Sequence, residues 1–225
     1  PADLVDFARG FTLTEGIATL DEVESIEAVE TPRGIDLQIW LTEAAAARQA
    51  KRRRSMAGPV GCGLCGIDSL EEALRQPRPI PETSFTMTPT QVLAAIRDLE
   101  NHQPLHDQTR AAHGAALWSD GAIRLAREDV GRHNALDKLI GAVRTSTHPA
   151  EDSALILTCR TSVDMVQKAC AAGFPVLIAV SAPTAAAVAM AEAAGLTLIA
   201  LARPDTFEIF THAARIRPEE AAHVA

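Results

Sequence analysis

The stretch ALILTCRTSVDMVQKACAAGFPVLIAVSAPTAAAVAMAEAAGLTLIALA, residues 154–202, contains three short apolar runs separated by two longer segments of helical spacing. A glycine follows each longer segment, as is common where a helix ends in a left-handed turn. The predicted elements are a strand over 154–158, a helix over 162–172, a strand over 175–180, a helix over 184–194 and a strand over 196–202. Strands that alternate with helices indicate βαβ crossovers, so the sequence predicts an α/β fold with a partly parallel sheet.

The residues upstream of this stretch add further elements. A helix over 90–100, a hairpin over 115–125 and a helix over 134–143 are predicted before the first of these strands. Nearer the N-terminus the spacing predicts a helix over 1–20, strands over 23–26 and 35–41, and a helix over 43–54. Four prolines fall within residues 75–90, which is typical of a linker. We therefore expect an N-terminal α+β region over 1–82 and an α/β domain over 83–225.

The charge, hydrophobicity and cysteine content argue against several classes of protein. The 225 residues carry a formal charge of −8, and such an acidic chain lacks the basic footprint of a general nucleic-acid binder. No apolar run approaches the roughly 18 residues of a membrane span, so no membrane segment is expected. The cysteines do not form the dense framework of a secreted scaffold, which favours a cytoplasmic protein. Because the chain begins at Pro1, it reads as part of a longer sequence, and a removed signal peptide stays an open alternative.

The stretch Gly61-Cys62-Gly63-Leu64-Cys65-Gly66 carries the most reactive side chains. A C-x-x-C pair commonly serves as half of a zinc site, as a thioredoxin-like redox pair or as a persulfide carrier. Zinc needs further ligands, and Cys159 and Cys170 fall in predicted regular elements. A redox pair sits between a strand and a helix rather than in a glycine-rich loop. Such a loop gives a thiolate the reach that sulfur transfer needs, and the arginines at 52–54 favour the thiolate. The alternative without any chemical role is that both cysteines are small apolar residues in a turn.

A second polar cluster, Glu128-Asp129-Val130-Gly131-Arg132-His133-Asn134, lies between a predicted strand and a predicted helix. Such a junction gathers backbone N–H groups and the positive end of a helix dipole, an arrangement that binds phosphate. Arg132, His133 and Lys138 add positive charge that suits a phosphate or a pterin. The alternative is purely structural, with Asp129 capping the helix and Lys138 paired to Asp137 or to solvent. Taken together, the cluster favours a binding site.

Several separated segments resemble the formate dehydrogenase accessory protein family, FdhD. They are LVDFARGFTLTEGI (4–17), CGLCG (62–66), EDVGRHNALDKLIG (128–141), DMVQKACAA (164–172), VSAPT (180–184) and Arg203 with Phe210-Thr211-His212. The resemblance extends over nearly the whole chain. It implies a homodimer and a cytidine-deaminase-like three-layer α/β fold with a smaller N-terminal α+β region. It does not imply deamination, because no H-x-E occurs in the sequence and the C-x-x-C follows a glycine.

The resemblance also implies a function. The chain would be a sulfurtransferase that relays sulfur from the persulfide of a cysteine desulfurase to the molybdenum bis(molybdopterin guanine dinucleotide) cofactor. That cofactor would be a bound substrate, destined for the catalytic subunit of formate dehydrogenase, and no permanent metal is expected. By position, Cys62 would carry the persulfide, and Cys65 would either release the sulfur by attacking Cys62 or tune it. The matching cofactor-binding stretch is Leu201, Ala202, Arg203, Pro204, Asp205 and Thr206, and further candidates are Arg132, His133 and Arg160.

Two other functions stay open on the sequence. A cofactor-binding chaperone would hold the molybdenum cofactor without moving sulfur, so Cys62 would be dispensable. A zinc-stabilised interaction module would hold a metal through Cys62 and Cys65, and its fold would depend on that metal.

Overall fold

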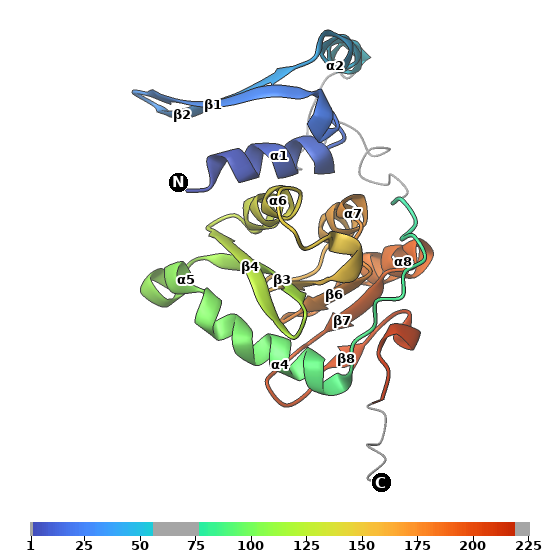
Figure 1. Cartoon of the computed structure of the whole chain (residues 1–225). Coiled ribbons are helices and arrows are strands. Elements are labelled where there is room, and N and C mark those ends of the chain that lie inside the picture. Colours follow the sequence, from blue (N-terminus) through green and yellow to red (C-terminus); the bar gives the residue numbers. More distant parts are fainter. Residues whose placement is uncertain (1, 56–76, 219–225) are drawn as a thin grey trace.

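The computed structural model describes residues 2–55 and 77–218. Figure 1 shows a small N-terminal group of elements above a larger layered body. The N-terminal group comprises α1 (Leu4–Thr14), the 3-10 turn η1 (Leu20–Glu22), β1 (Val23–Thr31), β2 (Gly34–Leu41) and α2 (Glu43–Ser55). The body comprises α4 (Pro89–Leu99), η2 (Glu100–His102), α5 (Pro104–Thr109), β3 (His113–Ser119), β4 (Ala122–Asp129), α6 (Arg132–Val143), η3 (Ala150–Asp152), β5 (Ala154–Leu157), α7 (Val163–Ala172), β6 (Val176–Ala179), α8 (Ala185–Ala194), β7 (Thr197–Ala200), β8 (Glu208–Ile209) and η4 (Ala213–Arg215).

Helix α1 packs on the body through small residues. A Cβ placed on Gly10 would lie 1.8 Å from the carbonyl oxygen of Asp137 in α6. Conversely, a Cβ on Gly141 in α6 would lie 1.8 Å from the carbonyl oxygen of Asp6 in α1. Because any larger side chain at either position would overlap the backbone of the facing helix, only glycine permits this crossing. Helix α1 therefore forms an extra layer over α6, as Figure 1 shows.

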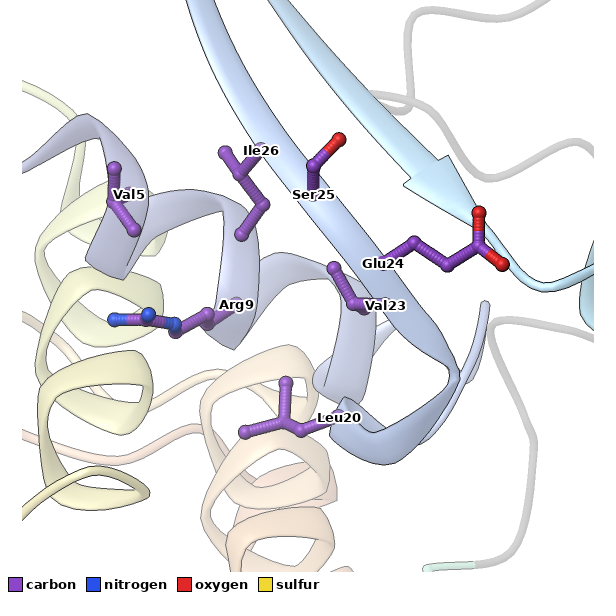
Figure 2. Close-up of a pocket in the computed structure, with 7 residues that line it drawn as sticks. All are labelled: Val5, Arg9, Leu20, Val23, Glu24, Ser25 and Ile26. Atoms are coloured by element: carbon purple, nitrogen blue, oxygen red, sulfur yellow. The ribbon is translucent and has the colours of Figure 1, made fainter.

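Strands β1 and β2 form an antiparallel ribbon that projects from the body (Figure 1). The ribbon pairs from Val23 opposite Leu41 at its base to Thr31 opposite Gly34 at its tip. A cleft of about 230 Å³ separates its base from α1, and Figure 2 shows Val5 and Ile26 on opposite sides of that cleft. The outer ribbon thus lies away from the main core, so its stability depends on the contacts at its base.

Helix α2 is held to the ribbon by hydrogen bonds around Glu22. The N–H of Thr42 donates to the Glu22 carbonyl at 2.9 Å, and Arg48 donates to both carboxylate oxygens of Glu22 at 2.7 Å. The bonds from Arg48, and after them those from Thr19, lower the pKa of Glu22 to about 2. The carboxylate therefore stays charged and keeps α2 attached over the ordinary pH range.

The body is built on a six-stranded sheet of order β4-β3-β5-β6-β7-β8. Strands β5, β6 and β7 are parallel, whereas β3 is antiparallel to both of its neighbours and β8 is antiparallel to β7. Two βαβ units, through α7 and α8, connect the three parallel strands. The predicted partly parallel sheet is therefore confirmed, and the crossovers lie where the glycine-ended helices predicted them.

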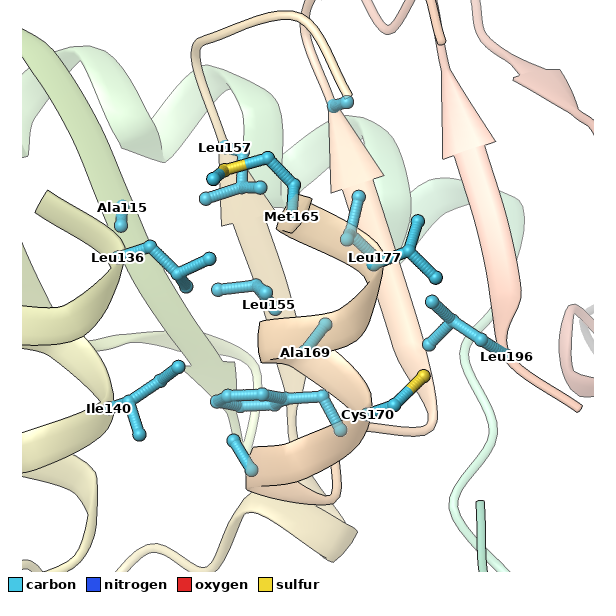
Figure 3. Close-up of a cluster of buried hydrophobic side chains, with 14 of the residues drawn as sticks. Ala115, Leu136, Ile140, Leu155, Leu157, Met165, Ala169, Cys170, Leu177 and Leu196 are labelled. Carbon is cyan, nitrogen blue, oxygen red and sulfur yellow. The ribbon is translucent and has the colours of Figure 1, made fainter. Parts of the chain in front are cut away.

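Apolar side chains cover both faces of the sheet. On one face, α6, α7 and α8 pack over the strands, and Figure 3 shows Met165, Ala169 and Cys170 of α7 against Leu155 and Leu177. On the other face, α4 packs through Val92, Ala95, Ile96 and Leu99. The four residues of each parallel strand are all buried, because their alternate side chains enter the two clusters.

Local chemistry explains where several helices begin and end. The hydroxyl of Thr88 accepts from the N–H of Gln91, the Gln91 side chain accepts from the N–H of Thr88, and Pro89 takes the first helical position of α4. Helices α7 and α8 stop where Gly173 (φ 90°) and Gly195 (φ 75°) adopt the left-handed conformation. These ends fix the short connections into β6 and β7.

The structure corrects several predicted boundaries. Within the predicted segment 1–20 the helix covers Leu4–Thr14 and closes at the predicted Thr14-Glu15-Gly16, whereas the first strand continues to Thr31 instead of ending at Ile26. Helix α5 and strand β8 had no counterpart in the prediction. The α/β class is confirmed, whereas the closer cytidine-deaminase-like assignment and the division between residues 82 and 83 stay predictions. Within 2–55 and 77–218, no helix has the length and apolar character needed to cross a membrane.

Candidate functional site

The carboxyl ends of the three parallel strands define one edge of the sheet. Strand β3 is antiparallel to β5, with Ala115 opposite Leu157, so β3 begins at this edge. Strand β4 ends there, because Asp129 pairs with His113. In open α/β sheets, ligands bind at the carboxyl ends of the strands, especially where neighbouring connections diverge. A ligand-binding site is therefore expected in the loops at this edge.

The predicted binding residues come together along this edge. Nε2 of His133 lies 3.7 Å from Oδ2 of Asp164, four positions after Arg160, so the start of α6 lies near the loop after β5. That loop bridges to the next through Thr161 and Pro183, and the N–H of Leu201 donates to the Ser181 carbonyl at 3.4 Å. Contacts thus link the loops after β4, β5, β6 and β7. We call Arg132, Arg160 and Arg203, together with the imidazole of His133, the cationic edge.

Asp129 organises the turn that precedes Arg132. Its Oδ1 accepts from the Gly131 N–H at 2.8 Å and from Asn134 at 3.1 Å, and its Oδ2 lies 2.7 Å from Nζ of Lys138. Burial acts to raise the pKa of Asp129, but the bonds from Lys138, Gly131 and Asn134 outweigh it and lower the pKa. The carboxylate thus stays charged and fixes the start of α6.

Lys138 does not contribute a charge to the edge. Its side chain is only 5% exposed, and its ammonium also donates to the carbonyl of Glu128 at 3.2 Å. The structural alternative paired Lys138 with Asp137 or solvent, and that pairing is wrong, because Asp137 instead binds Lys168. Arg132 therefore supplies the positive charge at the start of α6, with the imidazole of His133 beside it.

His133 is oriented by the next helix. Its Nε2 lies 3.7 Å from Oδ2 of Asp164 in the first turn of α7, and the hydroxyl of Ser162 lies 3.4 Å from the same oxygen. The interaction with His133 lowers the pKa of Asp164 despite partial burial. Both side chains are about one-third exposed (35% and 34%), so the imidazole can still meet a ligand.

Arg160 stands on a loop that is firmly tied to β3. The N–H of Gly114 donates to the hydroxyl of Thr158 at 2.9 Å, and the N–H of Thr158 donates to the Gly114 carbonyl at 3.1 Å. Cys159 next to it is buried, while Arg160 is exposed. The guanidinium of Arg160 is therefore presented to solvent from a rigid support.

The segment from Leu201 to Thr206 forms a tight turn after β7. Leu201 has φ 52°, and the N–H of Arg203 donates to the Thr206 carbonyl at 2.7 Å. The Arg203 guanidinium folds back so that Nη1 donates to the carbonyls of Val180 and Ala202. A guanidinium has five N–H donors, so this group can hold the backbone and still face an anion.

Not every residue of this segment faces outward. The side chain of Ala202 is 1% exposed and belongs to the core on the α4 side of the sheet. The carbonyl of Pro204 accepts from Nε of Arg97 in α4 at 2.9 Å. Ala202 therefore supplies backbone and packing rather than a side chain to any ligand.

The two cysteines of the C-x-x-C pair, Cys62 and Cys65, lie outside the described residues. The remaining cysteines are free thiols buried in the body. Burial raises the pKa of Cys159, against the opposing charge of Arg132, and raises the pKa of Cys170 to about 12. Both are therefore poor nucleophiles near neutral pH, because the thiolate is the reactive form. Among the described residues, no cluster of three His, Cys, Asp or Glu side chains could hold a metal ion.

Sequence reasoning missed the residues that support the edge. It placed Glu128 in the polar cluster but missed its contact with α5, where the carboxylate accepts from the N–H groups of Leu105 and His106 at 2.7 and 2.8 Å. It also missed the contact between His133 and Asp164, which lie 31 positions apart. The position of Asp164 in the first turn of a predicted helix could have marked it as a residue that stabilises the helix start. A contact between two helices, however, cannot be predicted from a single sequence.

Comparisons with known proteins agree with this architecture. A sequence model of the FdhD/NarQ family matches residues 1–217. The chain is 50% identical over 218 residues to the sulfur carrier protein FdhD of Agrobacterium fabrum, covering 96% of this chain and 80% of that protein. It is 52% identical over 218 residues to the sulfur carrier protein FdhD of Brucella abortus, covering 96% and 81%.

A solved structure supports the same relationship. The crystal structure of a candidate formate dehydrogenase accessory protein from Desulfotalea psychrophila superimposes with a TM-score of 0.73 at 27% identity. The similarity covers 96% of this chain and 81% of that one. From the family match and these relatives it follows that the chain belongs to the FdhD/NarQ family.

Proposed function

We propose that this chain is a sulfur carrier that accepts sulfur on Cys62 and delivers it to a molybdenum bis(molybdopterin guanine dinucleotide) cofactor bound at the cationic edge. The observation that carries the proposal is the gathering of Arg132, His133, Arg160 and Arg203 beside the strand ends. Relatives at about half identity named sulfur carrier protein FdhD support the same role.

The cationic edge suits a ligand with several phosphates. Guanidinium groups bind phosphate oxygens through paired N–H donors, and the first turn of a helix adds backbone N–H groups. Helices α6, α7 and α8 all begin at this edge, with Arg132 and His133 in the first turn of α6 and Arg160 in the loop before α7. The chain as a whole is acidic, so this positive region would draw an anionic ligand to one place.

Loading of Cys62 is a thiol exchange that needs no external electrons. The Cys62 thiolate attacks the terminal sulfur of the persulfide on a cysteine desulfurase, and the bond between the two donor sulfurs breaks. The donor cysteine leaves as a thiolate, and Cys62 becomes the persulfide. The buried thiols of Cys159 and Cys170 are unsuited to this step, which leaves the C-x-x-C pair.

Delivery has two balanced routes. Transfer of the terminal sulfur with Cys62 leaving as a thiolate moves a neutral sulfur atom, so the substrate molybdenum must give it two electrons. Attack of the Cys65 thiolate on Sγ of Cys62 instead releases hydrosulfide, leaves a disulfide between the two residues, and requires a dithiol reductant to restore the carrier.

The protein's partners in this scheme are a cysteine desulfurase and the catalytic subunit of formate dehydrogenase, with the carrier acting as a cytoplasmic homodimer.

Replacement of Cys62 tests the proposal against the chaperone alternative. In cells that lack the native gene, Cys62→Ala should abolish activation of formate dehydrogenase, because no persulfide can form. Cys170→Ala, which removes a buried thiol, is the matched control and should retain activation. If the Cys62→Ala protein supports full activation, the chain acts as a chaperone and the sulfur-carrier proposal fails.

A further inference from the structure

Gln103 occupies the bend between η2 and α5, and the surrounding backbone is held in place. The carbonyl of Gln103 accepts from the N–H of Asp107 in α5 at 2.9 Å. The N–H groups of Leu105 and His106 donate to the carboxylate of Glu128, near the end of β4. The position of Gln103 relative to the sheet is therefore fixed by backbone contacts that do not involve its own side chain.

The carboxamide of Gln103 lies against the start of β3. A Cβ placed on Gly114 would lie 3.1 Å from Nε2 of Gln103 and 3.4 Å from Cγ2 of Thr158, directly after β5. Because Gly114 has no side chain, the amide can lie this close to the strand. Side chains alternate along a strand, and Ala116 packs into the apolar cluster on the α4 side. The amide therefore lies on the α4 side of the sheet.

The same carboxamide is unpaired and accessible. Within residues 2–55 and 77–218, no hydrogen bond joins it to another group of the protein. Gln103 is partly exposed, and neither polar atom of the amide is buried, so water can solvate both in the free protein. A carboxamide has two N–H donors and one acceptor oxygen. All of them are available to a ligand without the loss of a bond within the protein.

The amide lies beside the cationic edge. Arg160 follows Thr158 by two positions, which is at most about 7 Å along the backbone. Glu128, which holds the bend at Gln103, comes directly before the turn that leads to Arg132. A ligand whose phosphates meet these arginines can therefore extend across the strand ends to Gln103.

An amide and a guanidinium group bind different parts of a ligand. Guanidinium groups suit phosphate oxygens, because both partners are charged. A neutral carboxamide instead pairs best with a ring edge that presents a donor next to an acceptor, as glutamine does with a nucleobase. Guanine and the pterin ring share such an edge, an aminopyrimidinone with a ring N–H beside a carbonyl.

We propose that Gln103 is a further binding residue that recognises this aminopyrimidinone edge, with Oε1 accepting from the ring N–H and Nε2 donating to the adjacent carbonyl. The ligand then lies across the strand ends, with its phosphates at the cationic edge and one ring on the α4 side. The inference rests on the proposed function, since it assigns a contact to the substrate proposed there.

Calorimetric titration of the full-length chain with three probes tests this contact. GDP carries guanine and phosphates, dihydroneopterin triphosphate carries a pterin and phosphates, and pyrophosphate carries no ring. Gln103→Leu removes both hydrogen bonds and keeps most of the side-chain volume. Gln108→Leu, which changes an exposed glutamine in α5, is the matched control.

Gln103→Leu should raise the Kd of a ring-bearing probe about tenfold and leave the Kd of pyrophosphate unchanged. The probe that shows the rise contains the ring that Gln103 contacts. Gln108→Leu should bind all three probes as the native chain does. Equal Kd values for the two variants would overturn the inference, as would a matching rise for pyrophosphate. If the native chain binds none of the probes, the proposed cofactor site itself fails.

Discussion

The ammonium of Lys168 lies 3.0 Å from both carboxylate oxygens of Asp137, in the layer between α6 and α7. Lys168 also donates to the Thr14 hydroxyl at 2.9 Å and to Glu15 at 2.8 Å, both at the end of α1. Burial raises the pKa of Asp137, while the Lys168 charge and the Thr14 hydroxyl act against that rise. This buried cluster joins three helices and so attaches the N-terminal elements to the body.

Replacing Lys168 with methionine should destabilise the fold strongly. The change keeps the unbranched apolar stem but leaves the Asp137 carboxyl buried without its cation, which typically costs about 3–5 kcal/mol of unfolding free energy. Arg110→Met, which breaks the exposed pair with Asp107, is the control and should cost at most about 1 kcal/mol. Urea unfolding measures both, and equal effects would contradict the role assigned to the buried cluster.

Adding one methyl group at Gly10 should weaken the crossing of α1 and α6. The alanine Cβ would meet the carbonyl of Asp137, so the helices must separate, at a cost of about 3 kcal/mol or more. Arg9→Ala changes the neighbouring, partly exposed residue and should stay within about 0.5 kcal/mol of the native chain. A thermal unfolding midpoint for Gly10→Ala equal to that of Arg9→Ala would show that the crossing tolerates a side chain.

The sequence predicted the α/β body better than the N-terminal elements, for physical reasons. The parallel strands at 154–157, 176–179 and 197–200 are short apolar runs between helices that end in glycine, so local signals and tertiary packing agree. The ribbon is largely exposed, and its strand 23–31 lacks apolar alternation beyond Ile26. The extra length of β1 comes from backbone pairing with β2, which side-chain pattern does not report.

The candidate site was predicted in part. Arg132 and His133 could be selected because they lie between a predicted strand and a predicted helix, whereas Arg160 and Arg203 were candidates through the family resemblance. The sequence did not predict the side-chain contacts that support the site. In these contacts Lys138 turns inward to Asp129, and Asp164 orients His133. The predicted roles of the selected residues in binding the cofactor stay predictions.

Acid should destabilise the protein partly through Asp129. Its pKa is lower in the folded chain than the ordinary value of 3.8, so on acidification the unfolded chain takes up the proton first. The stabilisation is complete above the ordinary value and is lost as the pH falls through the lowered value. The Asp129→Asn variant should therefore lose less unfolding free energy than the native chain between pH 5 and pH 2.5. The slope of its unfolding free energy against pH should reflect roughly one titrating carboxylate fewer. An unchanged slope would contradict the charged role of Asp129.

Removal of Arg160 should weaken nucleotide binding at the edge. GDP represents the nucleotide part of the proposed substrate, and loss of a charge-assisted bond to phosphate should raise its Kd about tenfold. Arg144→Ala, at the opposite end of α6, is the control and should bind GDP as the native chain does. Calorimetric titration measures both, and equal affinities would exclude Arg160 from the site.

The most direct test of the sulfur-carrier account is the intact mass of the protein after incubation with a cysteine desulfurase and L-cysteine, followed by peptide mapping. The account predicts one additional sulfur atom that is removed by a thiol reductant and lies on the peptide containing Cys62. A mass that stays unchanged, or an added sulfur on the peptides of Cys159 or Cys170, would contradict it.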